Sequence, residues 1–308
     1  MSSQPLVSIQ EQSLAAPIQV ENLTKRFGSF LAVDHVSFQI KSGEVFGWLG
    51  PNGAGKSTMM RVICGIYEQS YGKVWINGID SQVKREELQG LIGYLPQEFG
   101  SYENMSAYEF LDYQGILKGL TNPAQRATRI EYVLLSVHLW DRKDDKIGGY
   151  SGGMKQRIGI AQILLHLPRI LVVDEPTAGL DPRERIRFRN LLVELSRERV
   201  VIFSTHIIED ISSSCNQVAV VNRGELHYAG NPANMVKLAE GLVWQYTILA
   251  KDFDAFPAKD RVVHHMRDGD NIKLRFLSDI KPSEDAIQVK PVLEEAYLCM
   301  LKGLKVKN

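Results

Sequence analysis

The sequence predicts an α/β fold in which a mostly parallel sheet is covered by helices on both faces. Three nearly continuous apolar runs support this prediction, and they begin at Glu44 (EVFGWL), Ile170 (ILVV) and Val200 (VVIFSTH). Runs of this kind are typical of strands that are buried on both faces of a sheet. The first two runs lead into segments with helical periodicity, and strands that alternate with helices favour parallel pairing.

The 308-residue chain has the composition of a globular protein, with 44% hydrophobic and 23% charged residues. Its 36 basic residues balance its 36 acidic residues, which argues against a general nucleic-acid-binding protein. Cys64, Cys215 and Cys299 give neither a disulfide framework nor a metal-ligand spacing, so they fit a reducing cytosol. The N-terminal segment is not a secretory signal, and no apolar run approaches the ~18 to 20 residues of a membrane span. We therefore expect a chain that does not cross a bilayer.

The order of the remaining elements divides the chain into domains. We expect residues 1–17 to form a mostly flexible tail and residues 18–240 to form the main domain. This domain begins with two short strands that end near Ile40, and the Asn77-Gly78 turn predicts a hairpin after a further strand. These strands are expected to form an antiparallel β subdomain.

Two later segments differ in character from the alternating core. Helical periodicity replaces the strand signals over residues 98–165, which predicts an inserted helical subdomain. Residues 241–308 contain two segments that alternate like half-exposed strands, and they end in PVLEEAYLCMLKG, which has the pattern of a closing helix. This last segment predicts a small C-terminal α+β domain.

The stretch GPNGAGKST, residues 50–58, matches the phosphate-loop pattern G-x-x-x-x-G-K-[ST] and lies between an apolar strand and a helix. Its glycines let backbone N–H groups point at the α- and β-phosphates of a nucleotide, and the helix dipole attracts the anion. Lys56 is expected to reach the β- and γ-phosphates, and Ser57 to ligate Mg²⁺. The fold is therefore expected to be that of a P-loop ATPase. The predicted ATP-binding residues of this loop are Gly50, Pro51, Asn52, Gly53, Ala54, Gly55, Lys56, Ser57 and Thr58.

Two carboxylates follow the apolar strand that begins at Ile170. Asp174 is expected to leave the carboxyl edge of the sheet beside the phosphate loop and to orient Mg²⁺ through water. Glu175 is then placed to polarise the water that attacks the γ-phosphate. Beside a phosphate loop, this pair favours ATP hydrolysis over a solvated turn after a structural strand.

The stretch YSGGMKQR, residues 150–157, has the properties of a second anion site. Ser151 can cap the free N–H groups of the helix that follows, and Gly152 and Gly153 let a ligand approach the backbone closely. Since the phosphate loop already provides a complete site within one chain, the stretch raises the question of whose phosphate it holds.

Together these motifs resemble the ATP-binding subunit of an ABC (ATP-binding cassette) transporter, over about residues 18 to 235. YSGGMKQR resembles the signature sequence of that family, and Gln97, after the apolar stretch IGYLP, resembles its glutamine loop. Asp181 in AGLDP resembles the D-loop aspartate, and His206 in STH resembles the switch histidine. Phe27 lies where the family has an aromatic residue for adenine stacking.

The resemblance implies a role for each of these residues. Phe27 would present its ring to adenine, Gln97 would bind Mg²⁺ or the attacking water, and His206 would contact the γ-phosphate. Gln97 and His206 would join Lys56 and Glu175 as the catalytic residues. The residues expected to hold Mg²⁺ are Ser57, Gln97 and Asp174.

The resemblance also implies that two ATPase chains work together, either two copies of this chain or this chain with a paralogue. In the family, each ATP lies between the phosphate loop of one chain and the signature of the other. The second anion site would therefore hold the phosphate bound by the partner. The residues expected to contact that ATP are Ser151, Gly152, Gly153, Met154 and Asp181.

A separate membrane permease is implied as a further partner, with this chain bound to it at the cytoplasmic face of the cell membrane. Met154 stands where many members have Gln, and this variant resembles that of bacterial ATPases that export drugs, antibiotics or polysaccharides. Export is therefore the expected direction, and no nucleic-acid partner is expected. The substrate is not encoded here, because the permease forms the translocation path.

The main alternative is a soluble single-cassette ABC ATPase with a role outside transport. Translation-type members usually carry two cassettes in one chain, and repair-type members place hundreds of coiled-coil residues between the two nucleotide motifs. Here only 118 positions separate Lys56 from Asp174. A P-loop kinase is a different class, and it would give no reason for YSGGMKQR, Gln97 or His206.

Overall fold

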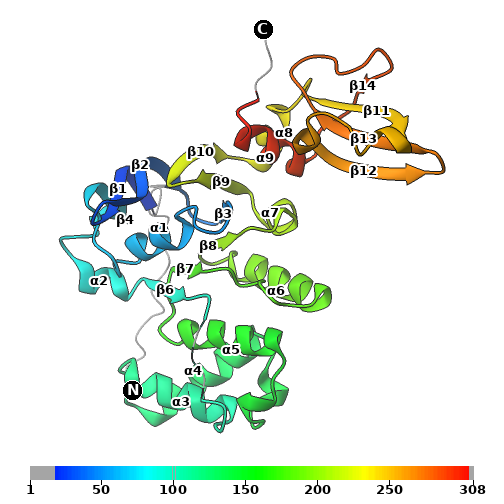
Figure 1. Ribbon diagram of the computed structural model, residues 1–308. Helices are drawn as coiled ribbons and strands as arrows, with labels where there is room; N and C mark the ends of the chain where they lie inside the picture. The colour runs from blue at the N-terminus through cyan, green and yellow to red at the C-terminus, as the bar shows by residue number, and fades with distance from the viewer. Residues whose placement is uncertain (1–17, 99, 101, 305–308) are drawn as a thin grey trace.

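The computed structural model describes residues 18–98, 100 and 102–304, and three sheets with surrounding helices make up its fold (Figure 1). The predicted tail, residues 1–17, lies outside the described residues. The largest sheet has six strands, of which β10 and β9 pair antiparallel and the other neighbours pair in parallel. In spatial order they are β10 (Glu225–Gly230), β9 (Gln217–Asn222), β3 (Val45–Leu49), β8 (Val200–Thr205), β7 (Ile170–Val173) and β6 (Ile92–Leu95).

Alternate side chains of β3 face two different core layers. Phe46 and Trp48 belong to one buried cluster, and Val45 and Leu49 belong to the other. Because both faces are covered, every residue of β3 is buried, which explains its continuous apolar run. The predicted mostly parallel sheet with two covered faces is therefore confirmed.

The first layer lies between the six-stranded sheet and an antiparallel sheet near the N-terminus. Met59 and Met60 of α1 (Lys56–Ile63) share this cluster with side chains of both sheets. The short helix α2 (Arg85–Gln89) follows the antiparallel sheet. In spatial order the antiparallel strands are β2 (Phe30–Ile40), β1 (Ile18–Phe27), β4 (Tyr71–Ile76) and β5 (Ile79–Asp80).

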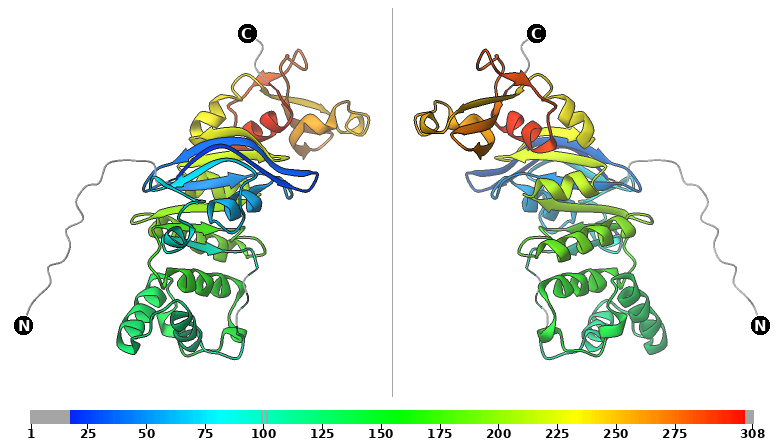
Figure 2. Two further views of the ribbon diagram at one scale, coloured as in Figure 1. Left: turned by 90° about the vertical axis from the view of Figure 1, so that its left-hand side faces the viewer. Right: turned by 90° about the vertical axis from the view of Figure 1, so that its right-hand side faces the viewer.

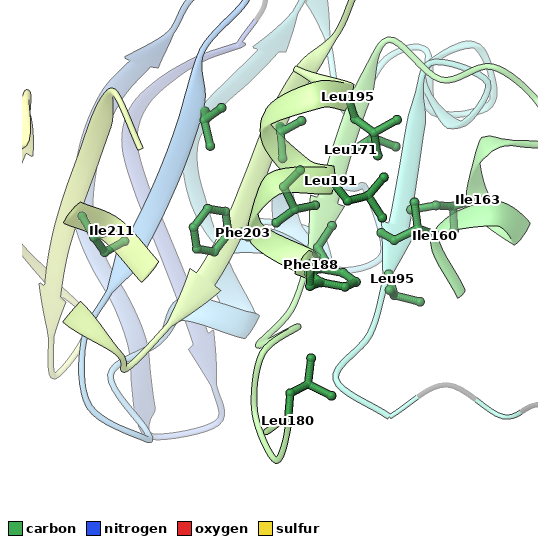
Figure 3. Packing of buried hydrophobic residues seen from close by; sticks show 14 of the residues in the cluster. Leu95, Ile160, Ile163, Leu171, Leu180, Phe188, Leu191, Leu195, Phe203 and Ile211 are labelled. Atoms are coloured by element: carbon green, nitrogen blue, oxygen red, sulfur yellow. The ribbon is translucent and has the colours of Figure 1, made fainter. Parts of the chain in front are cut away.

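The second layer packs α6 (Pro182–Leu195) against the other face of the six-stranded sheet. Figure 3 shows Phe188, Leu191 and Leu195 of this helix close to Leu171 and Phe203 of the strands. The apolar residues of α6 recur every three or four positions, so one side of an otherwise charged helix is apolar.

Helices form the segment between β6 and β7. Ser106 and Glu109 make a capping box at the start of the first helix, and Asn122 caps the second helix before Pro123. Both views of Figure 2 place these helices at one end of the molecule and the C-terminal sheet at the other. The helical elements are α3 (Ala107–Leu117), α4 (Pro123–Ser136), η1 (Trp140–Arg142), η2 (Ile147–Gly149) and α5 (Gly152–Leu164).

The C-terminal segment packs in two places. Its four-stranded sheet has a small core of its own around Tyr246, Leu274 and Phe276, whereas Ala296 of the last helix joins the main cluster that contains Ile211. In the described part of the chain, no helix has the length and apolar character needed to cross a membrane. The remaining elements are α7 (Ile208–Ser214), α8 (Pro232–Lys237), β11 (Val243–Leu249), η3 (Ala250–Asp252), η4 (Lys259–Arg261), β12 (Val262–Asp268), β13 (Asn271–Leu277), β14 (Ile287–Gln288) and α9 (Leu293–Leu301).

Candidate active site

The glycine-rich loop connects β3 to α1 and is pressed against the surrounding backbone. A Cβ atom at Gly50 would lie 2.2 Å from the carbonyl oxygen of Val221, and one at Gly55 would lie 2.5 Å from that of Ala32. Gly55 also has a left-handed backbone, with φ of 102°, and it precedes α1 without a side-chain cap. The first turn of α1 therefore has no side chain that competes with an anion for its N–H groups.

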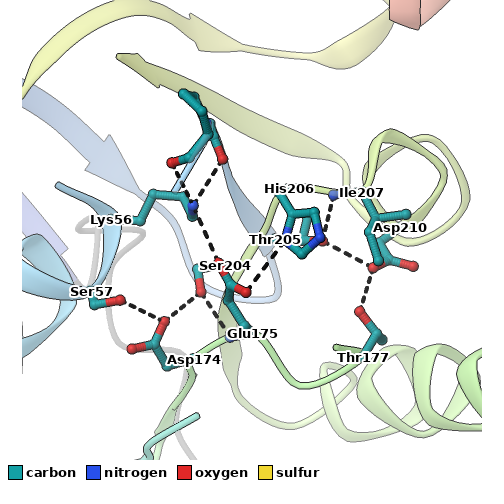
Figure 4. A network of polar contacts seen from close by, with 12 residues as sticks. Lys56, Ser57, Asp174, Glu175, Thr177, Ser204, Thr205, His206, Ile207 and Asp210 are labelled. Atoms are coloured by element: carbon teal, nitrogen blue, oxygen red, sulfur yellow. Dashed lines mark hydrogen bonds and ion pairs between the residues drawn. The ribbon is translucent and has the colours of Figure 1, made fainter. Parts of the chain in front are cut away.

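Lys56 lies inside this loop and is almost completely buried. Its Nζ donates hydrogen bonds to the carbonyl oxygens of Gly50 at 2.8 Å and Pro51 at 3.1 Å (Figure 4). The same nitrogen lies 3.4 Å from Oε1 of Glu175. The ammonium group is thus held by three oxygens at the position where the loop opens toward a ligand.

Asp174 directly follows strand β7, and its buried carboxylate accepts hydrogen bonds from hydroxyl groups. Ser57 donates to its Oδ1 at 3.0 Å, Ser204 donates to the same oxygen at 2.6 Å, and the Tyr94 hydroxyl is 3.4 Å from Oδ2. Burial raises the pKa of Tyr94 to about 12, although the hydrogen bond from Arg61 opposes this shift, so Tyr94 remains a donor at neutral pH. Neither Ser204 nor Tyr94 was predicted from the sequence, although Ser204 is a polar residue within an apolar strand.

The oxygen atoms of Ser57 and Asp174 suit a hard cation such as Mg²⁺, which prefers oxygen ligands. Within the described residues, no group of three or more His, Cys, Asp or Glu side chains could hold a metal. A cation at Ser57 and Asp174 would therefore take its other ligands from phosphate oxygens and water, as Mg²⁺ does in many nucleotide sites.

Glu175 has an unusual backbone conformation that fixes the direction of its carboxylate. Its φ is 45°, in the left-handed region that non-glycine residues rarely adopt, and its N–H donates to the Ser204 hydroxyl at 2.8 Å. The carboxylate lies between Lys56 and His206, whose Nδ1 is 3.3 Å from Oε2 (Figure 4). Strain of this kind persists where the surrounding structure enforces it, and it is frequent in active sites.

A cavity of about 300 Å³ opens beside these groups. Gln97 and Glu175 line it, so the structure places the predicted glutamine-loop residue next to the phosphate loop. The cavity is also lined by Phe30, which the sequence reasoning did not single out. Phe27 instead contacts Tyr67 edge to face, with ring centroids 5.5 Å apart. The complete lining is Phe30, Ala32, Asn52, Gly53, Ala54, Gly55, Lys56, Ser57, Thr58, Gln97 and Glu175.

The stretch YSGGMKQR begins α5 as predicted. Ser151 is the N-cap of the helix and accepts a hydrogen bond from the N–H of Met154 at 3.3 Å. Gly153 is buried against α6 of the same chain, where a Cβ atom would lie 2.2 Å from Oε2 of Glu184. Asp181 caps α6 by accepting from the N–H of Glu184 at 2.9 Å. The signature and the D-loop are therefore neighbours within one chain.

The predicted site residues thus form two separate groups. Among the described residues, those lining the cavity include none from YSGGMKQR and not Asp181. His206 is half exposed and joins the first group through its contact with Glu175.

Comparison with known proteins identifies relatives over most of the chain. The ABC transporter family model matches residues 33–178. The linearmycin resistance ATP-binding protein LnrL of Bacillus subtilis (strain 168) is 33% identical over 281 residues, or 91% of this chain and 90% of the relative. The bacitracin transport ATP-binding protein BcrA of Bacillus licheniformis is 36% identical over 211 residues, or 68% of each chain.

A solved structure has the same fold. It is the dimeric structure of a post-hydrolysis state of the ATP-binding cassette MJ0796 bound to ADP and Pi. It is 28% identical with a TM-score of 0.61, and the match covers 70% of this chain and 98% of that chain. These relatives confirm the P-loop ATPase fold and support a transporter subunit rather than a soluble ATPase outside transport. The chain belongs to the ABC transporter family, as one of its ATP-binding subunits.

Proposed function

We propose that this chain hydrolyses ATP at the cavity beside the phosphate loop and thereby powers transport. The observation that carries the proposal is the position of Glu175, whose carboxylate lies between Lys56 and His206 at the edge of that cavity. The phosphates of ATP would occupy the loop and draw the Lys56 ammonium away from Glu175. The freed carboxylate would then polarise a water molecule for attack on the γ-phosphate.

The other predicted site residues would position the reactants. Phosphoryl transfer depends mainly on positioning and on stabilisation of charge, so fixed donors around the phosphates account for much of the rate. His206 would donate to the γ-phosphate, Gln97 would orient the attacking water, and Phe27 would stack on adenine. Ser57, Asp174 and Gln97 would hold Mg²⁺, which neutralises phosphate charge when it is bound.

We also propose that the active form contains two ATPase chains. The separation of the cavity from Ser151 and Gly153 supports this proposal, and the similar cassette MJ0796 was solved as a dimer. Each ATP would contact the phosphate loop of one chain and Ser151, Gly152, Gly153, Met154 and Asp181 of the other. Binding would close the dimer, and hydrolysis with product release would reopen it.

The dimer would act on a membrane permease and would lie on the cytoplasmic face of the cell membrane. Export is the direction supported by the names of LnrL and BcrA, which concern antibiotic resistance and antibiotic transport. Residues 98–165 would form the subdomain that transmits motion to the permease, within an ATPase domain of residues 18–240. The role of residues 241–308 would be accessory, and no nucleic-acid partner is proposed, since the net charge is zero.

Substitution of Lys56 tests whether the cavity binds nucleotide. In Lys56→Ala, we expect ATP affinity to fall about 10- to 100-fold, because charged hydrogen bonds to phosphate are lost. Lys251→Ala, an exposed lysine in the C-terminal segment, is the matched control and should keep native affinity. The measurement is a binding titration with the full chain. Native affinity in Lys56→Ala would contradict the proposed site.

A further inference from the structure

Asp210 is a fully buried carboxylate that the proposed mechanism does not use. It lies in the first turn of α7, four residues after His206, and none of its surface is exposed to solvent. A buried carboxylate is unfavourable unless donors surround it. Asp210 has three such donors, and they come from three different segments of the chain.

Two of the donors to Asp210 lie beside the proposed catalytic residues. Oδ2 accepts hydrogen bonds from the hydroxyls of Thr177 at 2.6 Å and Thr205 at 3.0 Å (Figure 4). Thr177 is two residues after Glu175, and Thr205 immediately precedes His206. One carboxylate oxygen therefore ties the backbone that carries the proposed base to the backbone that carries the switch histidine.

Two further contacts complete this network. The Thr205 hydroxyl oxygen accepts from the N–H of Ile207 at 2.9 Å. This hydrogen bond joins the residues on either side of His206. Oδ1 of Asp210 is 3.4 Å from a guanidinium nitrogen of Arg189, which lies on α6 after the D-loop. The network thus also reaches the helix that begins at Asp181.

We propose that Asp210 is a positioning residue for ATP hydrolysis, which holds Glu175 and His206 at the separation that catalysis requires. This inference rests on the proposed function of that pair. A buried polar network is frequently no more stable than well-packed apolar side chains of similar volume, so stability alone gives no reason for this one. Its partners instead flank the two groups whose relative position sets the geometry of water attack, where an error of about 1 Å can lower a rate by about 100-fold.

The first test compares Asp210→Asn with Glu209→Gln, an exposed carboxylate on the same helix. Asparagine keeps the size of the side chain but replaces one carboxylate oxygen with an NH₂ group, which donates and does not accept. Its remaining oxygen can face either the two threonines or Arg189, so the three donors are no longer all satisfied. We expect kcat for phosphate release by the full chain to fall about 10- to 100-fold. The KM for ATP should change by less than about threefold, because the phosphate loop is intact. Glu209→Gln should leave both constants at their native values.

A second test separates positioning from packing and does not depend on the folding of Asp210→Asn. Thr177→Val removes the hydroxyl and keeps the shape, whereas Thr177→Ser keeps the hydroxyl and removes a methyl group. A positioning role predicts that kcat falls in the valine variant and is retained in the serine variant. A packing role predicts the reverse, since only serine leaves a cavity.

The inference is overturned if Asp210→Asn and Thr177→Val keep native kcat per folded chain, with the folded fraction measured by circular dichroism. It is also overturned if Thr177→Ser loses as much activity as Thr177→Val. Glu175→Gln in the same assay distinguishes a failure of the proposed function from a failure of the proposed role of Asp210. If Glu175→Gln retains turnover, the proposed function itself is wrong. If it stops turnover while the Asp210 and Thr177 variants remain active, only the role of Asp210 is wrong.

Discussion

Side chains come together in different ways at the carboxyl edge of the six-stranded sheet and at the C-terminal sheet. At the carboxyl edge, the neighbouring strands β3, β8 and β7 run parallel and end together. The segments that follow them carry Lys56, His206 and Glu175, which meet regardless of how many residues are inserted between the strands. The C-terminal sheet is antiparallel, and its contacts with α9 depend on the pair Arg275–Glu295 and on packing.

The comparison indicates that the two regions respond to mutation in different ways. The residues at the carboxyl edge are proposed to catalyse ATP hydrolysis. The sheet that holds them is stabilised mainly by its own buried core. The C-terminal contacts hold α9 against the main cluster, to which Ala296 of α9 and Ile211 of α7 both belong. We therefore expect changes at the edge to alter hydrolysis and changes at α9 to alter stability.

The largest expected effect is that of a substitution at Gly153. It tests whether the carboxyl edge of the sheet in one chain is sufficient for ATP hydrolysis. Gly153→Asp would place a negative side chain against Glu184. In the proposed dimer, this side chain would also lie beside the phosphate of the ATP bound by the other chain. We expect hydrolysis to fall by about 100-fold or more, as when a donor to a transition-state oxygen is removed. ATP affinity of the single chain should remain native, because the cavity is separate.

Gly149→Asp is the matched control for this change. Gly149 ends η2, four residues before Gly153, is exposed, and has open space where a Cβ atom would be added. Phosphate release and ATP titration should both remain native in this variant. Equal loss of ATP affinity and hydrolysis in Gly153→Asp would contradict a site shared between two chains.

The next effect concerns Glu295, which tests whether α9 contributes stability rather than chemistry. Its buried carboxylate accepts from Nη2 of Arg275 at 2.9 Å and from the N–H of Val292 at 2.8 Å. Glu295→Ala should lower the free energy of unfolding by about 2 kcal/mol, because it leaves both donors without this partner. Urea denaturation of this variant and of Glu294→Ala, its exposed neighbour, gives the comparison. A native unfolding free energy in Glu295→Ala would show that α9 is held by apolar packing alone.

The smallest effect concerns His166, which joins the end of α5 to the sheet and belongs to neither region. Burial, with the nearby charge of Lys118, lowers the pKa of His166 below its ordinary value of 6.5, and its Nε2 donates to the carbonyl oxygen of Ile92 at 3.1 Å. The unfolded chain therefore binds a proton below pH 6.5 that the folded chain does not bind. Stability should decrease as the pH falls from 6.5 toward the lower folded pKa.

His166→Gln keeps a donor for Ile92 and removes this titration. We expect the acid loss of stability to shrink by at most about 1 kcal/mol, measured by thermal unfolding at pH 5 and pH 7. An unchanged pH dependence in His166→Gln would show that His166 does not contribute to acid instability.

The sequence was sufficient for the parallel sheet and for the residues around the phosphate loop, because parallel strands and contiguous motifs follow simple rules. Glu175 and Gln97 line the same cavity as the loop, as predicted from motifs far apart in the chain. The cavity wall at Phe30 was not predicted, since Phe30 begins β2 in the antiparallel sheet and approaches the loop only through tertiary packing.

Contacts between elements also could not be predicted from the sequence patterns. No periodicity indicates that Gly153 packs on Glu184, or that one oxygen of Asp210 accepts from two threonines. The C-terminal segment was predicted as a separate small domain, but nothing in its alternating strands indicates that α9 joins the core of the ATPase. These contacts depend on the relative positions of whole elements, which local patterns do not contain.

The most direct test of the central claim is the rate of ATP hydrolysis by Glu175→Gln. Glutamine keeps the size and hydrogen-bonding reach of the side chain but cannot act as a base, so we expect turnover to fall about 100- to 10,000-fold. ATP binding should be retained and the variant should accumulate as an ATP-bound dimer, measured by titration and by light scattering. Native turnover in Glu175→Gln would contradict the assignment of Glu175 as the base.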